Sequence, residues 1–174
     1  TVTVVDTTAA IITLNGSGTI TLEVWDSYTD SWATFSDFID GTWSITAVWT
    51  VNTSSTWSTI LTYDYTDSSG NPSVQVTRTV NVVDTTIPVI TLNGSGTLTI
   101  EAWSVYSDLW AEFTDNIDGT WSVTASWVVD TSSTGSTILT YDYTDSSGND
   151  AVQVSRTVTV VDTTAAIITL NGSG

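Results

Sequence analysis

The chain has 174 residues and a formal net charge of −17, because 19 acidic side chains face only two basic ones. This charge argues against nucleic acids and anionic membrane surfaces as partners, since almost no side chain can neutralise a phosphate. Cysteine and histidine are both absent, which excludes disulfide bonds, zinc sites and iron–sulfur clusters. No apolar run is long enough to span a bilayer, so membrane insertion is not expected.

An internal repeat organises the chain. The stretch TVTVVDTTAAIITLNGSG at residues 1–18 returns letter for letter at residues 157–174, and a close variant occupies residues 79–96. Such regular recurrence indicates tandem structural units of a longer repetitive polymer. The predicted boundaries are a closing strand of a preceding repeat at 1–6, repeat 1 at 7–84, repeat 2 at 85–162, and the first strand and hairpin of a following repeat at 163–174.

Six short strands are predicted in the first repeat, and the second repeat follows the same pattern. In chain order they cover residues 11–14, 19–24, 33–36, 43–51, 59–66 and 74–83. The pair Asn15-Gly16 predicts a hairpin between the first two strands, because both residues tolerate a positive φ. Residues 25–32 show no clean period and are predicted to form a loop.

Alternation along these strands indicates which side chains enter the core. Trp43 and Trp49 share one face of the fourth strand with Ile45 and Val51, so core packing is the preferred interpretation for both tryptophans. The second repeat has the same arrangement at the equivalent positions.

Two polar side chains have predicted structural roles. Arg78 lies in the apolar register of the last strand and is expected to snorkel to the sheet end or to pair with a buried carboxylate, with Asp64 and Asp37 as candidates. Tyr63 precedes a turn in a pattern similar to the tyrosine corner of Ig-type sandwiches, in which the phenol bonds to the backbone. Arg156 repeats the arginine position.

Composition and spacing together predict the fold class. The sequence is rich in Val, Ile, Thr, Tyr and Trp, which are the residues that favour strands. Short alternating segments separated by Gly, Asn and Asp turns, without a helical period, indicate an all-β protein. We expect tandem Ig-like β-sandwich domains with about 78 residues per repeat.

The order of several short motifs resembles the bacterial immunoglobulin-like surface repeats, the HYR-like modules found in tandem in adhesins and extracellular fibres. In the second repeat these motifs are VVDTTIPVITLNG, DNIDG, TYDYTDSSGN and VQVSRTVTVVD. The resemblance implies a secreted or surface-exposed stalk of stacked sandwiches without enzymatic activity. The chain departs from the family pattern where tryptophans replace small residues; Trp57, for example, stands at the position of Gly135.

Acidic residues gather in the turns of the second repeat and in the connector before it. Calcium takes about six to eight oxygen ligands, and the candidate ligands are Asp84, Asp115, Asn116, Asp118, Asp145 and Asp150. The simpler interpretation is that these side chains form the turns, because neither loop has EF-hand spacing. The first repeat is expected to bind calcium less well, because Phe38 replaces Asn116 and Pro72 replaces Asp150.

Tryptophans outside the predicted strands are candidate interface residues: Trp25, Trp32, Trp57, Trp103 and Trp110. Aromatic side chains are enriched in interface hot spots. Packing against other copies of the chain is preferred over binding of glycans, which would need polar groups beside the indole ring.

The predicted function is a structural repeat of an extracellular filament or cell-surface stalk that assembles by stacking of sandwiches. Two alternatives remain open: a monomeric adhesin stalk made rigid by calcium, and a carbohydrate-binding module that uses loop tryptophans. Catalysis is not expected, since a chain without histidine, cysteine or lysine lacks the usual bases and activated nucleophiles.

Overall fold

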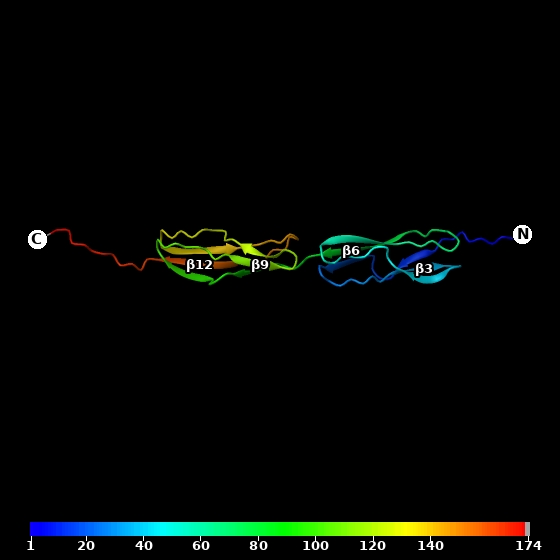
Figure 1. The fold of residues 1–174 in the computed structure, drawn as a ribbon, viewed down its shortest axis with the longest axis horizontal. Coiled ribbons are helices and arrows are strands. Elements are labelled where there is room, and N and C mark those ends of the chain that lie inside the picture. Colours follow the sequence, from blue (N-terminus) through cyan, green and yellow to red (C-terminus); the bar gives the residue numbers. More distant parts are fainter. Residues whose placement is uncertain (173–174) are drawn as a thin grey trace. The chain divides into compact units, whose positions relative to one another are not determined.

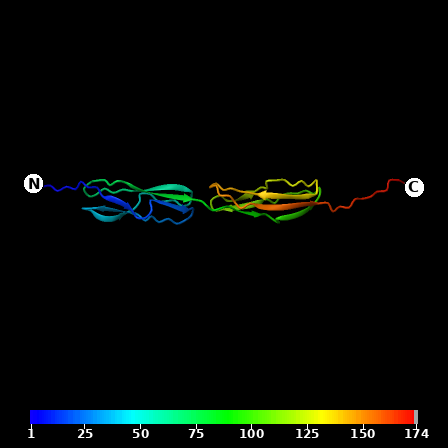
Figure 2. The same cartoon turned by 180° about the vertical axis from the view of Figure 1, so that it is seen from behind.

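The computed structural model describes residues 1–172 and divides the chain into two compact units, one over Thr1–Thr85 and the next from Thr86 onward. Each unit appears as its own group of strands in Figure 1, and Figure 2 shows the same groups from behind. Within the described residues every regular element is a strand, which confirms the predicted all-β class. None of these residues forms a helix that could cross a membrane.

The first unit is built from six strands in two three-stranded sheets. The strands are β1 (Ile11–Leu14), β2 (Thr19–Glu23), β3 (Ala33–Asp37), β4 (Gly41–Ile45), β5 (Trp57–Tyr63) and β6 (Val76–Val83). One sheet has the order β1-β3-β4 and the other has the order β2-β6-β5. Each strand lies close to a segment that the sequence predicts as a strand, although several ends differ.

The predicted hairpin between β1 and β2 is wrong, because the two strands belong to different sheets. β1 pairs with β3 in antiparallel orientation, and β2 pairs with β6 in parallel orientation. Asn15-Gly16 does turn the chain, with Gly16 at a φ of 91°. The turn sends the chain across to the opposite sheet, and Arg78 binds two backbone carbonyls of this segment.

The core of the first unit lies between its two sheets. Its buried residues are Ala10, Ile12, Ala33, Phe35, Leu61, Tyr63 and Val80. Phe35 stacks on Tyr65 with ring centroids 3.6 Å apart and an interplanar angle of 13°, so the two rings cover each other's apolar faces. The inward residues alternate along β3, β5 and β6, as expected for sheets with one face on the core.

The second unit repeats this architecture. Its strands are β7 (Val89–Leu92), β8 (Thr97–Glu101), β9 (Ala111–Asp115), β10 (Gly119–Val123), β11 (Gly135–Tyr141) and β12 (Val154–Val161). The sheets have the orders β7-β9-β10 and β8-β12-β11, with β8 and β12 parallel. Phe113 stacks on Tyr143 at 3.5 Å, so the core arrangement recurs along with the strands.

Three segments differ from the sequence prediction. The fourth strand ends at Ile45 and does not continue to Val51. Residues 1–10 and 162–172 contain no strand. The counterparts of residues 1–5 form strand in β6 and β12, and the counterparts of residues 167–170 form β1 and β7. In those places each strand pairs with other strands of its own repeat. The end of the hairpin predicted within 163–174 lies at residues 173–174, outside the described residues.

Candidate cation-binding site

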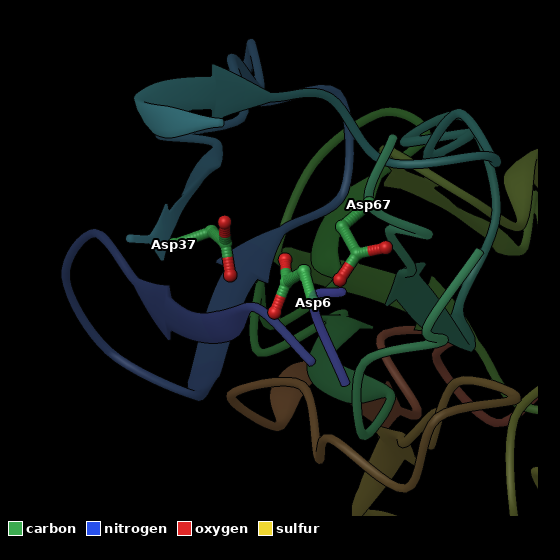
Figure 3. A group of neighbouring side chains, drawn as sticks. All are labelled: Asp6, Asp37 and Asp67. Atoms are coloured by element: carbon green, nitrogen blue, oxygen red, sulfur yellow. The ribbon is translucent and has the colours of Figure 1, made fainter. Parts of the chain in front are cut away.

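Three carboxylates converge at one end of the first unit. One oxygen from each of Asp6, Asp37 and Asp67 can be chosen so that all three lie within 4.8 Å of one another. Figure 3 shows the Asp6 carboxylate between the other two, with the three groups facing a common space. Side chains of like charge repel at this spacing, so the arrangement favours a cation among them.

Turns and a connector hold the three residues in place. Asp6 lies in the connector before β1, and its main-chain oxygen accepts a hydrogen bond of 3.2 Å from Asn71 Nδ2. Asp37 ends β3, and its Oδ1 accepts from the backbone N–H groups of the next turn at 2.7 and 2.9 Å. Asp67 starts the turn after β5 and accepts from the backbone and the side chain of Asn71 at 2.7 and 2.8 Å.

Ionisation is supported at Asp67 by hydrogen bonding. The residue is only 5% exposed, and burial opposes its charged form. Hydrogen bonds from the backbone and side chain of Asn71 and from the backbone of Ser69 outweigh this effect and hold the pKa of Asp67 below its ordinary value. The carboxylate is therefore charged at neutral pH.

One oxygen of the cluster has no hydrogen-bond donor. Asp6 Oδ1 accepts from the backbone N–H of Thr8 at 3.0 Å, whereas Asp6 Oδ2 is buried and unpartnered. A buried polar atom without a partner is uncommon in folded proteins. The chain has no lysine or histidine, and both arginines bind other aspartates, so no side-chain cation is available to these acids.

The structure brings together only part of the predicted calcium set in the second unit. Asp115 and Asp145 have carboxylate oxygens within 4.8 Å of each other. Asp115 ends β9 and Asp145 lies in the turn after β11, as Asp37 ends β3 and Asp67 lies in the turn after β5. Asp115 Oδ2 is buried and unpartnered. Asp84 lies at the end of the first unit and is 7% exposed.

The remaining candidates bond elsewhere. Asp118 accepts from the Tyr143 hydroxyl at 3.0 Å and from the backbone and hydroxyl of Ser146 at 2.7 Å each, and the bonds from Ser146 lower its pKa. Asp150 accepts from Thr144 Oγ1. Asn116 donates to Thr86 Oγ1 at 3.2 Å.

Sequence reasoning missed the cluster in the first unit, although a signal was present. Asp6, Asp37 and Asp67 each have an aspartate at the equivalent position of the next repeat. A set of acids repeated at the period of the fold, one in the connector and one at each of two turns, would have identified the three positions. Phe38 and Pro72, at which the first repeat departs from the second, do not belong to the cluster.

Arg78 forms a buried ion pair with Asp30, not with the predicted Asp64 or Asp37. The guanidinium is fully buried, and it also donates to the main-chain oxygens of Asn15 at 2.6 Å and Ser17 at 3.0 Å. The prediction failed because Asp30 lies in the irregular segment 25–32, where strand register gives no guidance. Arg156 makes the same contacts with Asp108 in the second unit.

The tyrosine corner predicted at Tyr63 is also incorrect in its partner. The Tyr63 hydroxyl donates to Asp30 Oδ1 at 2.7 Å and not to the backbone. Burial opposes ionisation of Asp30, but the hydrogen bonds from Tyr63 and Tyr28 and the charge of Arg78 outweigh it and lower the pKa of this carboxyl. The group of four side chains is a structural network that joins the sheet of β5 and β6 to the loop between β2 and β3.

All nine tryptophans are exposed, with exposed fractions between 49% and 78%. The prediction that Trp43 and Trp49 pack in the core is therefore wrong, since they are 68% and 64% exposed. Trp43 lies on the edge strand β4, where its indole N–H donates to the Asp40 carbonyl at 3.2 Å. Trp49 lies beyond the end of that strand, so the strand register does not apply to it.

Four tryptophans have a left-handed backbone conformation. The φ angles are 69° at Trp25 and 62° at Trp32, Trp103 and Trp110. This region is unfavourable for bulky side chains and is most often occupied by glycine. The strained backbone lies at positions where tryptophan stands in place of the small residues of the family pattern.

A small cavity lies beside two tryptophans in the second unit. Its volume is about 220 Å³, and its lining includes Tyr106, Asp108, Trp110 and Trp127. The first unit has a counterpart of about 180 Å³ at the same place in the repeat. Aromatic and hydrogen-bonding groups therefore meet at one surface position in each unit.

Comparison with known proteins gives the domain type. The family model described as bacterial surface protein, Ig-like domain, matches residues 12–82 and 90–160. Hyalin from Strongylocentrotus purpuratus is 38% identical over 125 residues, which cover 66% of this chain and 10% of Hyalin. The chain thus spans about a tenth of the length of that relative. A lipoprotein structure from Bacteroides thetaiotaomicron is 20% identical with a TM-score of 0.39, covering 46% of this chain and 40% of the lipoprotein.

Proposed function

Since the chain belongs to the bacterial surface protein Ig-like domain family, we propose that it supplies the structural repeats of an extracellular filament or cell-surface stalk. Domains of this family support a structural or adhesive role outside the cell and are typically not enzymes. The family and the similarity to Hyalin both support an extracellular or surface location. Assembly into a filament is the specific part of the proposal.

The observation that carries the proposal is the recurrence of one complete folding unit along the chain. Each unit has its own core and the same strand order. Because each unit contains its own core, such units can be joined in any number along a chain. Such a design suits a stalk, whose function depends on length and not on a catalytic cleft.

The exposed tryptophans are the proposed contacts between copies. Trp and other aromatic residues dominate the energetics of interfaces, and nine exposed indole rings in a chain of this size are a large apolar surface to leave in water. The net charge of −17 opposes self-association. Assembly is therefore expected to strengthen as salt or divalent cations screen the acids.

Sedimentation velocity and electron microscopy over a range of protein and salt concentrations test this assembly. Oligomers or fibres that grow with protein concentration are expected, and they should weaken in Trp57→Gly. Glycine occupies the equivalent position 135 in the second unit, where β11 forms normally, so this variant keeps the fold. A strictly monomeric chain under all conditions would contradict filament assembly and leave the monomeric stalk.

The cavity beside Trp110 and Trp127 favours a second candidate function, which is carbohydrate binding. The two indole rings beside this cavity suit a sugar ring, because the faces of a sugar are apolar and stack on aromatic side chains. Binding to a glycan array that is lost in Trp127→Ala but kept in Trp57→Ala would support this function. No binding to any glycan on the array by the unsubstituted chain would count against it.

A further inference from the structure

We propose that Asp6, Asp37 and Asp67 bind a calcium ion at the start of the first repeat. The three carboxylates come from the connector, the end of β3 and the turn after β5, and their oxygens lie within 4.8 Å of one another. Figure 3 shows them directed into one space. This inference goes beyond the structural role proposed above and does not depend on it.

The unpartnered oxygen of Asp6 is the observation that separates this cluster from an ordinary group of surface acids. Asp6 Oδ2 has less than 1 Å² of accessible surface and no hydrogen-bond donor. Among the described residues, no N–H or O–H group therefore donates to this oxygen. A metal ion between the three carboxylates supplies the missing partner, and no lysine or histidine exists in the chain to do so.

The donor set and spacing favour calcium over other cations. All the donors are oxygens, which suit calcium and magnesium and not zinc or copper. Oxygens that all lie within 4.8 Å of one another can reach one calcium ion, since calcium–oxygen distances are about 2.3–2.6 Å. Calcium also accepts irregularly placed protein oxygens, whereas magnesium demands near-octahedral geometry and keeps several of its waters.

An ion at this position ties the entering chain to the sandwich. Asp6 precedes β1, and its backbone is held to the turn after β5 by a hydrogen bond of 3.2 Å from Asn71. An ion bound by Asp6, Asp37 and Asp67 links the connector to the end of β3 and to the turn after β5. The connector at residues 6–9 then becomes part of the folded unit and loses the freedom of a linker.

Calcium binding by the full chain tests the site, with isothermal titration calorimetry of Asp6→Asn against a matched control, Asp64→Asn. Both variants remove one negative charge from the first unit. Asparagine keeps the Oδ1 that accepts from Thr8, so the fold is retained in Asp6→Asn. Asp64 is exposed and bonds only to the Gln75 side chain among the hydrogen bonds described. We expect Asp6→Asn to lose one equivalent of bound calcium relative to Asp64→Asn.

Two further measurements distinguish binding from screening of charge. With a dissociation constant of about 10⁻⁴–10⁻³ M, as in other extracellular modules, 10 mM calcium is expected to raise the melting temperature of the first unit by about 6–20 °C. Hydrogen exchange at residues 6–9 is expected to slow with calcium. Equal calcium stoichiometry in Asp6→Asn and Asp64→Asn, or an equal rise in melting temperature with magnesium, would overturn the proposal and leave the structural role intact.

Discussion

Replacing Arg156 with methionine is expected to remove a large fraction of the stability of the second unit. The guanidinium is fully buried, pairs with Asp108, and donates to the main-chain oxygens of Ser95 at 3.0 Å and Asn93 at 2.5 Å. Methionine fills a similar volume without any donor. The substitution leaves a carboxylate and two carbonyls without their partner inside the unit.

The expected loss follows from the cost of an unpaired charge. Breaking a buried ion pair by removing one partner costs about 3–5 kcal/mol. The Asp108 side chain keeps 15% of its surface exposed, so water recovers part of this cost and a loss of about 3 kcal/mol is expected. A unit of this size has roughly 4–12 kcal/mol of unfolding free energy in total, and the change is therefore a large fraction of it.

Urea unfolding of the full chain, followed by circular dichroism, measures the effect. The midpoint of one transition is expected to fall by about 1–3 M while the other stays in place. Arg78→Met is the matched control and is expected to weaken the first unit by a similar amount. Adding Asp108→Asn to Arg156→Met is expected to restore part of the loss because it removes the uncompensated charge. A loss below about 1 kcal/mol would refute the reasoning, since the pair would then be no stronger than a surface salt bridge.

Two other measurements test the strained tryptophans and the buried tyrosines. Trp103 is 78% exposed at a φ of 62°, so Trp103→Gly is expected to stabilise the second unit by about 1 kcal/mol in thermal unfolding. The control is Trp127→Gly, which relieves no positive φ and is expected to be neutral or destabilising. Equal effects of the two substitutions would contradict the strain argument. Burial, with hydrogen bonding to a carboxylate, raises the pKa of Tyr63 and Tyr141 above 10.0, so their contribution to stability is complete below pH 10 and is lost as the pH rises further. Tyrosinate absorbance from these two residues is expected to appear only together with loss of the circular dichroism signal, and reversible ionisation near pH 10 in the folded chain would be inconsistent with it.

The strands with strong alternation were predicted well from the sequence. β1 has the predicted bounds, and β6 begins two residues later than expected and ends at the same residue. The family resemblance and the sandwich class were also confirmed, by the matches over residues 12–82 and 90–160. These features depend on local patterns and on the order of motifs, which a single sequence contains.

The failures have a common physical origin in contacts between segments far apart in the chain. Asn15-Gly16 has the chemistry of a hairpin turn, but the carbonyls around it are bound by Arg78, which lies 63 residues from Asn15. Strand register indicated that Trp43 points into the core, whereas the side chain is 68% exposed on the edge strand β4. The acidic cluster combines three segments, so only the repeat period could have linked its members before the structure was known.

The parallel pairing of β2 with β6 determines how a unit responds to tension. The chain leaves the first unit through β6, which is the central strand of its sheet and is bonded to β2 on one side and β5 on the other. A pull along β6 loads both ladders in shear, so their hydrogen bonds resist together and do not open one after another. Each repeat thereby gains mechanical strength at the strand through which force passes to the rest of the chain.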